Sequence, residues 1–195
     1  DVMKNIMKLA SIALVLLFTL FGLTNKASAA KLTLYCSVEI DVCEMLEQAY
    51  EKETGTKVAM TRASSGETFA KIKAESSNSK GDVRFGGTGD PHLTAAQENL
   101  TAEYKSSHFD DLLPAAQNQA VNANYKSVGI YVGALGFGYN KELLAKKGLP
   151  APKSWMDLTK PIYKGEIQIA NPNSSGTAYT TLATIIQIFG EDKGW

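Results

Sequence analysis

The sequence predicts an α/β protein with parallel strands, because predicted strands and helices alternate and because glycine- or serine-rich turns follow the strands. The strands are expected at residues 32–36, 57–61 and 82–85, and the helices between them at residues 41–53 and 67–75. This alternation is typical of a parallel sheet connected by crossover helices. Gly55 is expected to end the first helix in a left-handed conformation.

The N-terminal residues predict a secretory signal peptide over residues 1–29. Lys4 and Lys8 precede an apolar run at residues 9–23, which ends in the small-residue motif Ala-Ser-Ala at 27–29. An uncleaved anchor is the alternative. Removing three lysines and one aspartate from the 20 basic and 20 acidic residues leaves 17 and 19, a net charge of −2. This balance does not suggest a nucleic-acid partner.

Cys36 and Cys43 are the only cysteines, and they flank the predicted junction of the first strand and the first helix. In an exported protein such a pair is expected to form a disulfide. A redox pair or a metal site is the alternative, but His92 and His108 do not complete a recognised zinc spacing.

The second half of the chain is predicted to begin a second α/β unit. A helix is expected around residues 92–98, and a polar stretch follows at 106–126. An apolar, glycine-spaced strand pattern at 127–139 is assigned to the crossover between lobes. Further elements are expected as a helix from 140, a segment capped by Ser154, a strand at 165–170, a helix at 180–189 and a loop at 190–195. Too few elements remain to close this unit, which suggests a truncated gene or a fragment.

Two similar turns, SSGET at residues 64–68 and SSGTA at 174–178, each lie between a predicted strand and a predicted helix. Hydroxyls and glycine at a helix start allow unpaired N–H groups and the helix dipole to hold an anion. The glycine-rich run at 86–91 also follows a strand, where open parallel sheets bind ligands. The alternative is that each turn only caps its helix.

Enzymatic motifs are weak in this sequence. It contains neither a Gly-x-Ser-x-Gly motif nor a P-loop, and its glycine runs do not match Gly-x-Gly-x-x-Gly. The Ser-x-x-Lys match at 77–80 lies in a polar loop without its companion motifs. The sequence therefore favours a binding protein over an enzyme, and no cofactor is expected.

Several segments resemble the periplasmic substrate-binding proteins of ABC transporters, in the branch that contains ferric-iron and hexose-phosphate binders. They are LYCS at 34–37, EKETGTK at 51–57, GDV at 81–83, SWMDL at 154–158 and KGEIQIANPNSSGTAY at 164–179. The resemblance is closest to the hexose-phosphate binders. It implies a type 2 periplasmic-binding fold with two lobes, here with lobe 1 at 30–134 and the crossover and an incomplete second lobe at 135–195.

The resemblance also implies a function: a monomer in the periplasm that delivers a small anionic solute, such as a hexose phosphate, to a membrane permease. Ferric iron is an alternative solute, but Glu39 and Gly87 stand where ferric-iron binders commonly have a histidine and a glutamate. A remnant that binds no solute is a further alternative. The expected ligand-binding residues are Ser37, Ser65, Gly66 and Thr88 from lobe 1 and Ser175, Gly176 and Thr177 from lobe 2.

Overall fold

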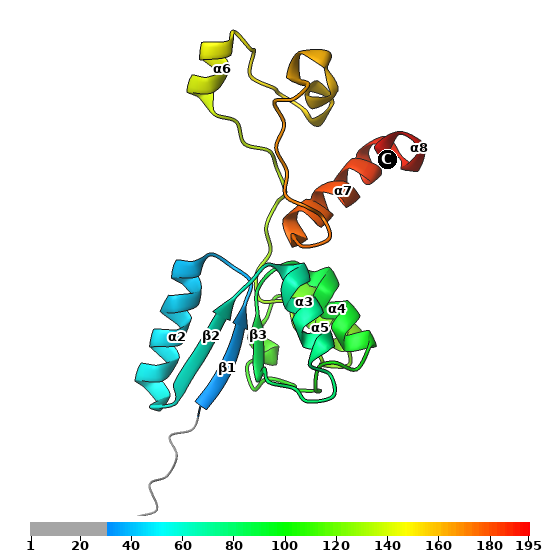
Figure 1. Cartoon of the computed structure of the whole chain (residues 1–195). Coiled ribbons are helices and arrows are strands. Elements are labelled where there is room, and N and C mark those ends of the chain that lie inside the picture. The colour runs from blue at the N-terminus through cyan, green and yellow to red at the C-terminus, as the bar shows by residue number, and fades with distance from the viewer. Residues whose placement is uncertain (1–30) are drawn as a thin grey trace, which may run out of the picture. The chain divides into compact units, whose positions relative to one another are not determined.

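The computed structural model describes residues 31–195 (Figure 1), so the predicted signal peptide lies outside the described residues. The strands are β1 (Lys31–Cys36), β2 (Lys57–Arg62) and β3 (Val83–Phe85). The α-helices are α2 (Ile40–Thr54), α3 (Ser65–Ala74), α4 (Gly89–Gln97), α5 (Pro114–Asn122), α6 (Lys141–Lys147), α7 (Gly176–Phe189) and α8 (Glu191–Gly194). Short 3₁₀ turns lie at Phe109–Asp111, Trp155–Thr159 and Pro161–Tyr163.

The three strands form one sheet in the order β2-β1-β3. β1 and β3 are parallel, with Leu34 opposite Val83 and Cys36 opposite Phe85. Helix α2 covers one face of the sheet, and α3 and α4 lie together on the other (Figure 1). This arrangement confirms the predicted α/β class, and it places the starts of α3 and α4 beside the carboxyl ends of the strands.

The core of the sheet is closed by a disulfide. Cys36 at the end of β1 is bonded to Cys43 in α2, and both side chains are fully buried. They pack with Leu34 and Val58, and Phe85 lies against this group. The predicted disulfide is therefore confirmed, and it joins the carboxyl end of β1 to the helix that follows.

The helix ends follow the sequence signals closely. Gly55 has a φ of 70° and its N–H donates to the carbonyl of Glu51, which confirms the predicted left-handed cap of α2. Asn140 caps α6 by accepting the N–H of Leu143 at 2.9 Å. Ser154 accepts the N–H of Asp157 at 3.2 Å and caps the 3₁₀ turn that follows.

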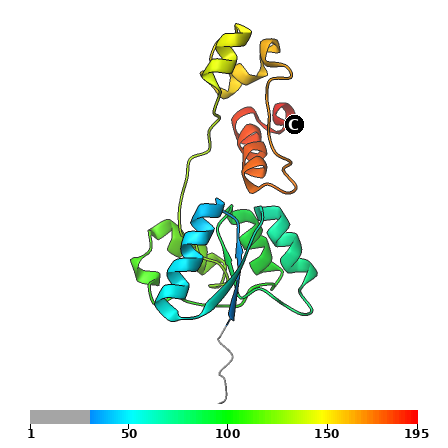
Figure 2. The same ribbon diagram turned by 60° about the vertical axis from the view of Figure 1, so that its left-hand side comes forward.

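Four expectations differ from the structure. The strand predicted at 165–170 is wrong, and the strand-like pattern at 127–139 forms an extended segment without strand pairing (Figure 2). A strand requires a hydrogen-bonded neighbour, and within residues 31–195 the sheet is confined to β1, β2 and β3. The polar stretch at 106–126 contains helix α5, which begins at Pro114, and the loop expected at 190–195 contains the single turn of α8.

In the part of the chain that the structure describes, no helix is both long enough and apolar enough to span a bilayer.

Candidate functional site

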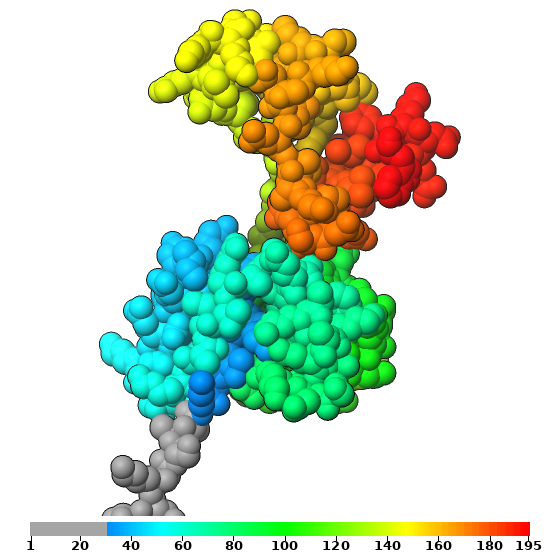
Figure 3. Space-filling view, viewed as in Figure 1, coloured from blue at the N-terminus to red at the C-terminus, as the bar shows by residue number. Residues whose placement is uncertain are grey.

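The two serine-glycine turns are in direct contact, although 110 residues separate them in sequence. The Ser64 hydroxyl lies 2.7 Å from the carbonyl oxygen of Ser174. The N–H of Gly66 donates to the same oxygen at 2.9 Å. In the space-filling view the orange segment that contains Ser174 abuts α3 (Figure 3). The fold therefore brings the two candidate anion-binding turns together.

A third helix start joins this contact. The N–H of Thr88, which precedes α4, donates to the Ser65 hydroxyl at 3.2 Å. A Cβ atom added to Gly176 would lie 2.6 Å from the Ser65 hydroxyl oxygen and closer still to that of Thr88. Position 176 therefore has no room for a side chain. We call Ser65, Thr88 and Gly176, at the starts of α3, α4 and α7, the helix-start cluster.

The helix-start cluster concentrates donors and positive partial charge. Each helix directs the positive end of its dipole and its unpaired N–H groups toward its first residue. Within residues 31–195, neither Gly176 nor Thr177 has a backbone acceptor for its N–H. The hydroxyl oxygen of Thr88 is buried, and it has no hydrogen-bond partner in the described part of the chain. Such a set of donors is suited to hold an anion.

The predicted residues of the first lobe all lie at or beside this cluster. The Ser37 hydroxyl is 3.0 Å from that of Thr68, a buried residue of α3. Thr68 is therefore a neighbour of the site, and its place in the SSGET turn was the sequence signal for it. The N–H of Gly66 is occupied by Ser174 in this arrangement, so its role toward a ligand stays a prediction.

The three residues predicted in the second turn differ in their contacts and in their burial. The Ser175 hydroxyl accepts the N–H of Ala178 at 3.3 Å and caps α7. Gly176 is buried, whereas Thr177 is exposed. The N–H groups of Gly176 and Thr177, rather than the Ser175 hydroxyl, are thus the free donors of this turn.

Glu67 acts as a helix-start residue. Its carboxylate accepts the backbone N–H of Ser64 at 3.0 Å and lies 2.6 Å from the Ser64 hydroxyl. The hydrogen bond to the Ser64 side chain, followed by that to the Ser64 backbone, lowers the pKa of Glu67. The carboxylate of Glu67 is therefore held at the start of α3, where it caps the helix.

Two residues that the sequence analysis missed also support the cluster. The Tyr131 hydroxyl, from the extended 127–139 segment, accepts the N–H of Gly87 at 2.8 Å and donates to its carbonyl at 2.9 Å. Arg84 of β3 donates to the carbonyl of Ser65 at 3.0 Å. Neither residue belongs to a recognisable motif, because both act through tertiary contacts.

His92 of α4 connects that helix to the glycine-rich turn. Its Nε2 atom lies 2.8 Å from the carbonyl oxygen of Gly86. Burial, and then the charge of Arg84, lower the pKa of His92 below its usual value of 6.5. The neutral imidazole is therefore the form that the fold favours, and it donates from Nε2 to Gly86.

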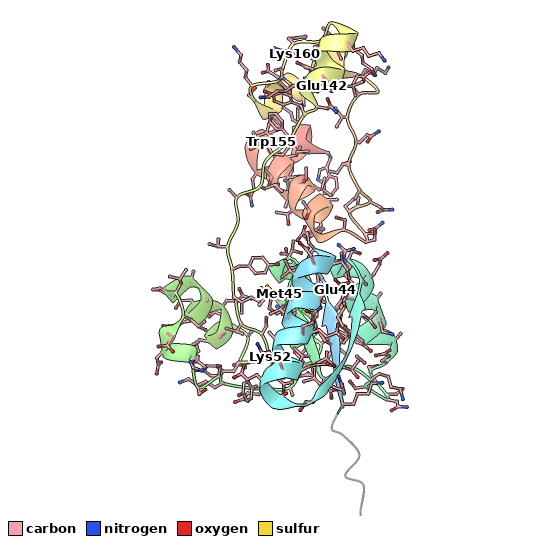
Figure 4. The ribbon with its side chains drawn as sticks, turned by 90° about the vertical axis from the view of Figure 1, so that its left-hand side faces the viewer. Glu44, Met45, Lys52, Glu142, Trp155 and Lys160 are labelled. Atoms are coloured by element: carbon pink, nitrogen blue, oxygen red, sulfur yellow. A yellow bond between two sulfur atoms is a disulfide. The ribbon has the colours of Figure 1, made fainter. Side chains whose placement is uncertain are left out.

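Two observations concern other parts of the described chain. Within residues 31–195, no group of three or more histidine, cysteine, aspartate or glutamate side chains is placed to hold a metal ion. A shallow hollow of about 410 Å³ runs along α2 and includes Glu44, Met45 and Lys52 (Figure 4). None of the helix-start residues lines this hollow.

Comparisons with known proteins identify the family to which the chain is similar. The family model for bacterial extracellular solute-binding proteins matches residues 88–195. An uncharacterized protein of Haemophilus influenzae is 42% identical over 187 residues, which cover 95% of this chain and 54% of the relative.

Solved structures agree with the family match. The periplasmic binding protein AfuA from Actinobacillus pleuropneumoniae, described with exogenous fructose-6-phosphate bound, is 44% identical with a TM-score of 0.81, over 86% of this chain and 53% of AfuA. The periplasmic binding protein P5PA is 42% identical with a TM-score of 0.80, over 85% of this chain and 52% of P5PA. Iron-bound HitA from Pseudomonas aeruginosa, at 22% identity and a TM-score of 0.60, shares the fold. The chain thus spans about half the length of the relatives it matches.

Proposed function

This chain belongs to the bacterial extracellular solute-binding protein family, and we propose that it captures a phosphorylated sugar or a similar small anion for an ABC importer. The observation that carries this proposal is the meeting of three helix starts at Ser65, Thr88 and Gly176. Three positive helix ends and several free donors at one point favour a compact, negatively charged group.

The choice of a sugar phosphate rests on the comparison with AfuA. That protein is described with fructose-6-phosphate bound, and the present chain is 44% identical to it. Ferric iron is the weaker candidate, because the likeness to HitA at 22% identity concerns only the fold. The proposed solute is therefore a hexose phosphate, held by its phosphoryl group at the helix-start cluster.

Binding at this point requires the ligand to replace contacts between the two turns. The Ser174 carbonyl accepts hydrogen bonds from the Gly66 N–H and from the Ser64 hydroxyl. A phosphoryl group would take over such donors and add the free N–H groups of Gly176 and Thr177. Charge-assisted hydrogen bonds contribute about 1.5–3 kcal/mol each, and a micromolar dissociation constant corresponds to about 8 kcal/mol. Several such bonds suffice for micromolar binding before ordering costs.

The proposal assigns roles to the parts of the chain. Residues 1–29 direct export to the periplasm and are removed, residues 30–134 form lobe 1, and residues 135–195 form the crossover and the beginning of lobe 2. The solute is contacted from lobe 1 by Ser37, Ser65, Gly66 and Thr88, and from lobe 2 by Ser175, Gly176 and Thr177. The loaded protein acts as a monomer, without catalysis, and delivers its solute to a membrane permease.

A thermal-shift panel tests this proposal on the 195-residue chain and on any longer form that the same gene encodes. The panel contains fructose 6-phosphate, fructose, inorganic phosphate and ferric citrate. A ligand at about 100 times its dissociation constant adds about 2.7 kcal/mol. We expect a higher Tm with fructose 6-phosphate and little change with fructose. A shift with ferric citrate alone would replace this proposal by iron binding, and no shift in any form would refute it.

A double variant tests the second turn directly. Ser175→Ala removes the hydroxyl that caps α7, and Thr177→Val removes an exposed hydroxyl beside it, so the double variant loosens the turn that presents the free N–H groups. Thr184→Val is the matched control, because that hydroxyl donates to the Thr180 carbonyl farther along the same helix. The double variant is expected to weaken the sugar phosphate at least tenfold, and the control is expected to bind normally.

A further inference from the structure

Arg84 connects two of the three helix starts. One guanidinium nitrogen, Nη2, donates to the carbonyl of Ser65 in the first turn of α3 at 3.0 Å. The other, Nη1, donates to the carbonyl of Pro91 in the first turn of α4 at 3.2 Å. A single side chain from β3 therefore holds the starts of α3 and α4 at a fixed separation.

The charge of Arg84 is not neutralised within residues 31–195. Both of its acceptors are neutral backbone carbonyls, and its Nε atom is buried without a partner. None of the ion pairs in this part of the chain includes Arg84. Arg84 is half-buried, so its charge is partly withdrawn from water, and an unpaired charge in such a position favours a compensating interaction.

The electrostatic surroundings show that this charge persists and acts on its neighbours. Burial lowers the pKa of Arg84 to about 10, which still leaves the guanidinium protonated at neutral pH. Its charge contributes to the lowered pKa of His92 on the adjacent helix. Glu67 is bonded to Ser64 instead of Arg84, and Asp90 is exposed.

We propose that Arg84 is a specificity-determining residue of this solute site: its unneutralised charge behind the starts of α3 and α4 selects solutes that carry a doubly charged phosphoryl group. This inference rests on the proposed function. Arg84 acts through space, by its charge, because its hydrogen bonds are made to the protein and not to the ligand. The attraction grows with the charge of the ligand, so a dianion gains more from it than a monoanion or a neutral sugar.

The test uses isothermal titration calorimetry on the full-length protein with fructose 6-phosphate, fructose and inorganic phosphate. Titrations at pH 7.5 and pH 5 compare the dianion with the monoanion, because the second pKa of a phosphate ester is about 6. Arg84→Met removes the charge at similar length, and Arg84→Lys retains it. Arg62→Met is the matched control, since Arg62 is an exposed arginine that donates to the Val38 carbonyl at 3.0 Å.

We expect Arg84→Met to weaken fructose 6-phosphate at least tenfold at pH 7.5, which corresponds to about 1.4 kcal/mol, and to weaken it less at pH 5. Arg84→Lys keeps the positive charge at this position, so it is expected to bind within about threefold of the wild type, and Arg62→Met is expected to bind as the wild type does. If Arg84→Met does not fold, the lysine variant decides: a loss of more than tenfold there would show that guanidinium geometry matters instead of charge, and would overturn the inference.

The outcomes separate this inference from the function on which it rests. If the wild type binds fructose 6-phosphate and Arg84→Met binds it equally well, the inference fails and the proposed function stands. If the wild type binds only inorganic phosphate, and does so through Arg84, the charge selection stands and the sugar assignment fails. If the wild type binds neither anion, both fail.

Discussion

Substitution of Gly176 by alanine is the sharpest test of the contact among the three helix starts. The added methyl group would lie 2.6 Å from the Ser65 hydroxyl oxygen, 2.9 Å from the Ser65 Cβ atom and closest of all to the Thr88 hydroxyl. All three atoms belong to the short side chains of Ser65 and Thr88, which have little freedom to move. The structure must therefore shift α7 away from α3 and α4.

The expected cost follows from this overlap. Overpacking of a well-filled site costs about 1–3 kcal/mol. In a chain of this size each kcal/mol lowers Tm by about 2–4 °C. Fructose 6-phosphate should also bind more weakly to this variant, because displacement of α7 separates the donors that are proposed to share the ligand.

Gly89 provides a matched control for this experiment. Gly89 and Gly176 each occupy the first position of an α-helix, but among the described residues no atom lies within 4 Å of a Cβ added at Gly89. Gly89→Ala is expected to leave Tm unchanged or to raise it slightly, since alanine restricts the unfolded chain. Differential scanning calorimetry of both variants is the assay. Equal Tm and equal affinity in wild type and Gly176→Ala would refute the close contact of α7 with α3 and α4.

Two further predictions concern stability. Replacement of Cys36 and Cys43 together by alanine should lower the free energy of unfolding by about 2–3 kcal/mol, because their disulfide closes a short loop in the unfolded chain. Urea denaturation measures this loss, and an unchanged midpoint would contradict a stabilising role for the disulfide. The pKa of His92 is lowered below 6.5 in the fold, so the unfolded chain binds its proton first as the pH falls. The contribution of this ring to stability should therefore be intact above pH 6.5 and should decline as the pH drops toward the folded pKa. In thermal melts from pH 7.5 to pH 5, Tm should fall less steeply for His92→Gln than for the wild type, whereas the variant of a surface histidine, His108→Gln, should follow the wild type. Equal slopes for the wild type and His92→Gln would exclude this role.

The first half of the fold could be predicted from the sequence because its signals are local. Helix α2 ends at Gly55 as expected, and the three strands lie within one or two residues of their predicted bounds. The disulfide was predictable from two cysteines in a chain that the sequence predicts to be exported. Helix α5 was missed because its residues are polar or small on most sides, which removes the apolar period that marks a surface helix.

The strand predicted at 165–170 shows the limit of a periodic pattern. Ile167 and Ile169 alternate with polar residues as a strand requires, yet both are exposed. Alternation of apolar and polar residues indicates which side chains could share one face of a strand. A strand also needs the backbone of a neighbouring strand for its hydrogen bonds. The 127–139 segment is a similar case, since Tyr131 and Val132 are exposed and the segment has no strand partner in the described region.

The candidate site was predictable only in part. The two serine-glycine turns could be found because hydroxyl and glycine residues at a helix start are a local signature. Arg84 could not be found in this way, because an arginine in a short strand resembles a solvent-exposed residue until α3 and α4 are packed over it. The Tyr131 contact depends equally on a segment 44 residues away from Gly87.

The contact between Ser64 and Ser174 also sets the entropic cost of completing the site. The link between Ser65 and Thr88 closes a loop of 23 residues, whereas the link between Ser64 and Ser174 closes one of 110 residues. Loop-closure entropy grows with the logarithm of loop length, which makes the longer closure more costly by about 1.4 kcal/mol. The α3 and α4 side of the site is thus the cheaper part to form, and α7 completes it at the greater entropic cost. A ligand that contacts α7 offsets this final closure, so part of its binding free energy is used to complete the fold.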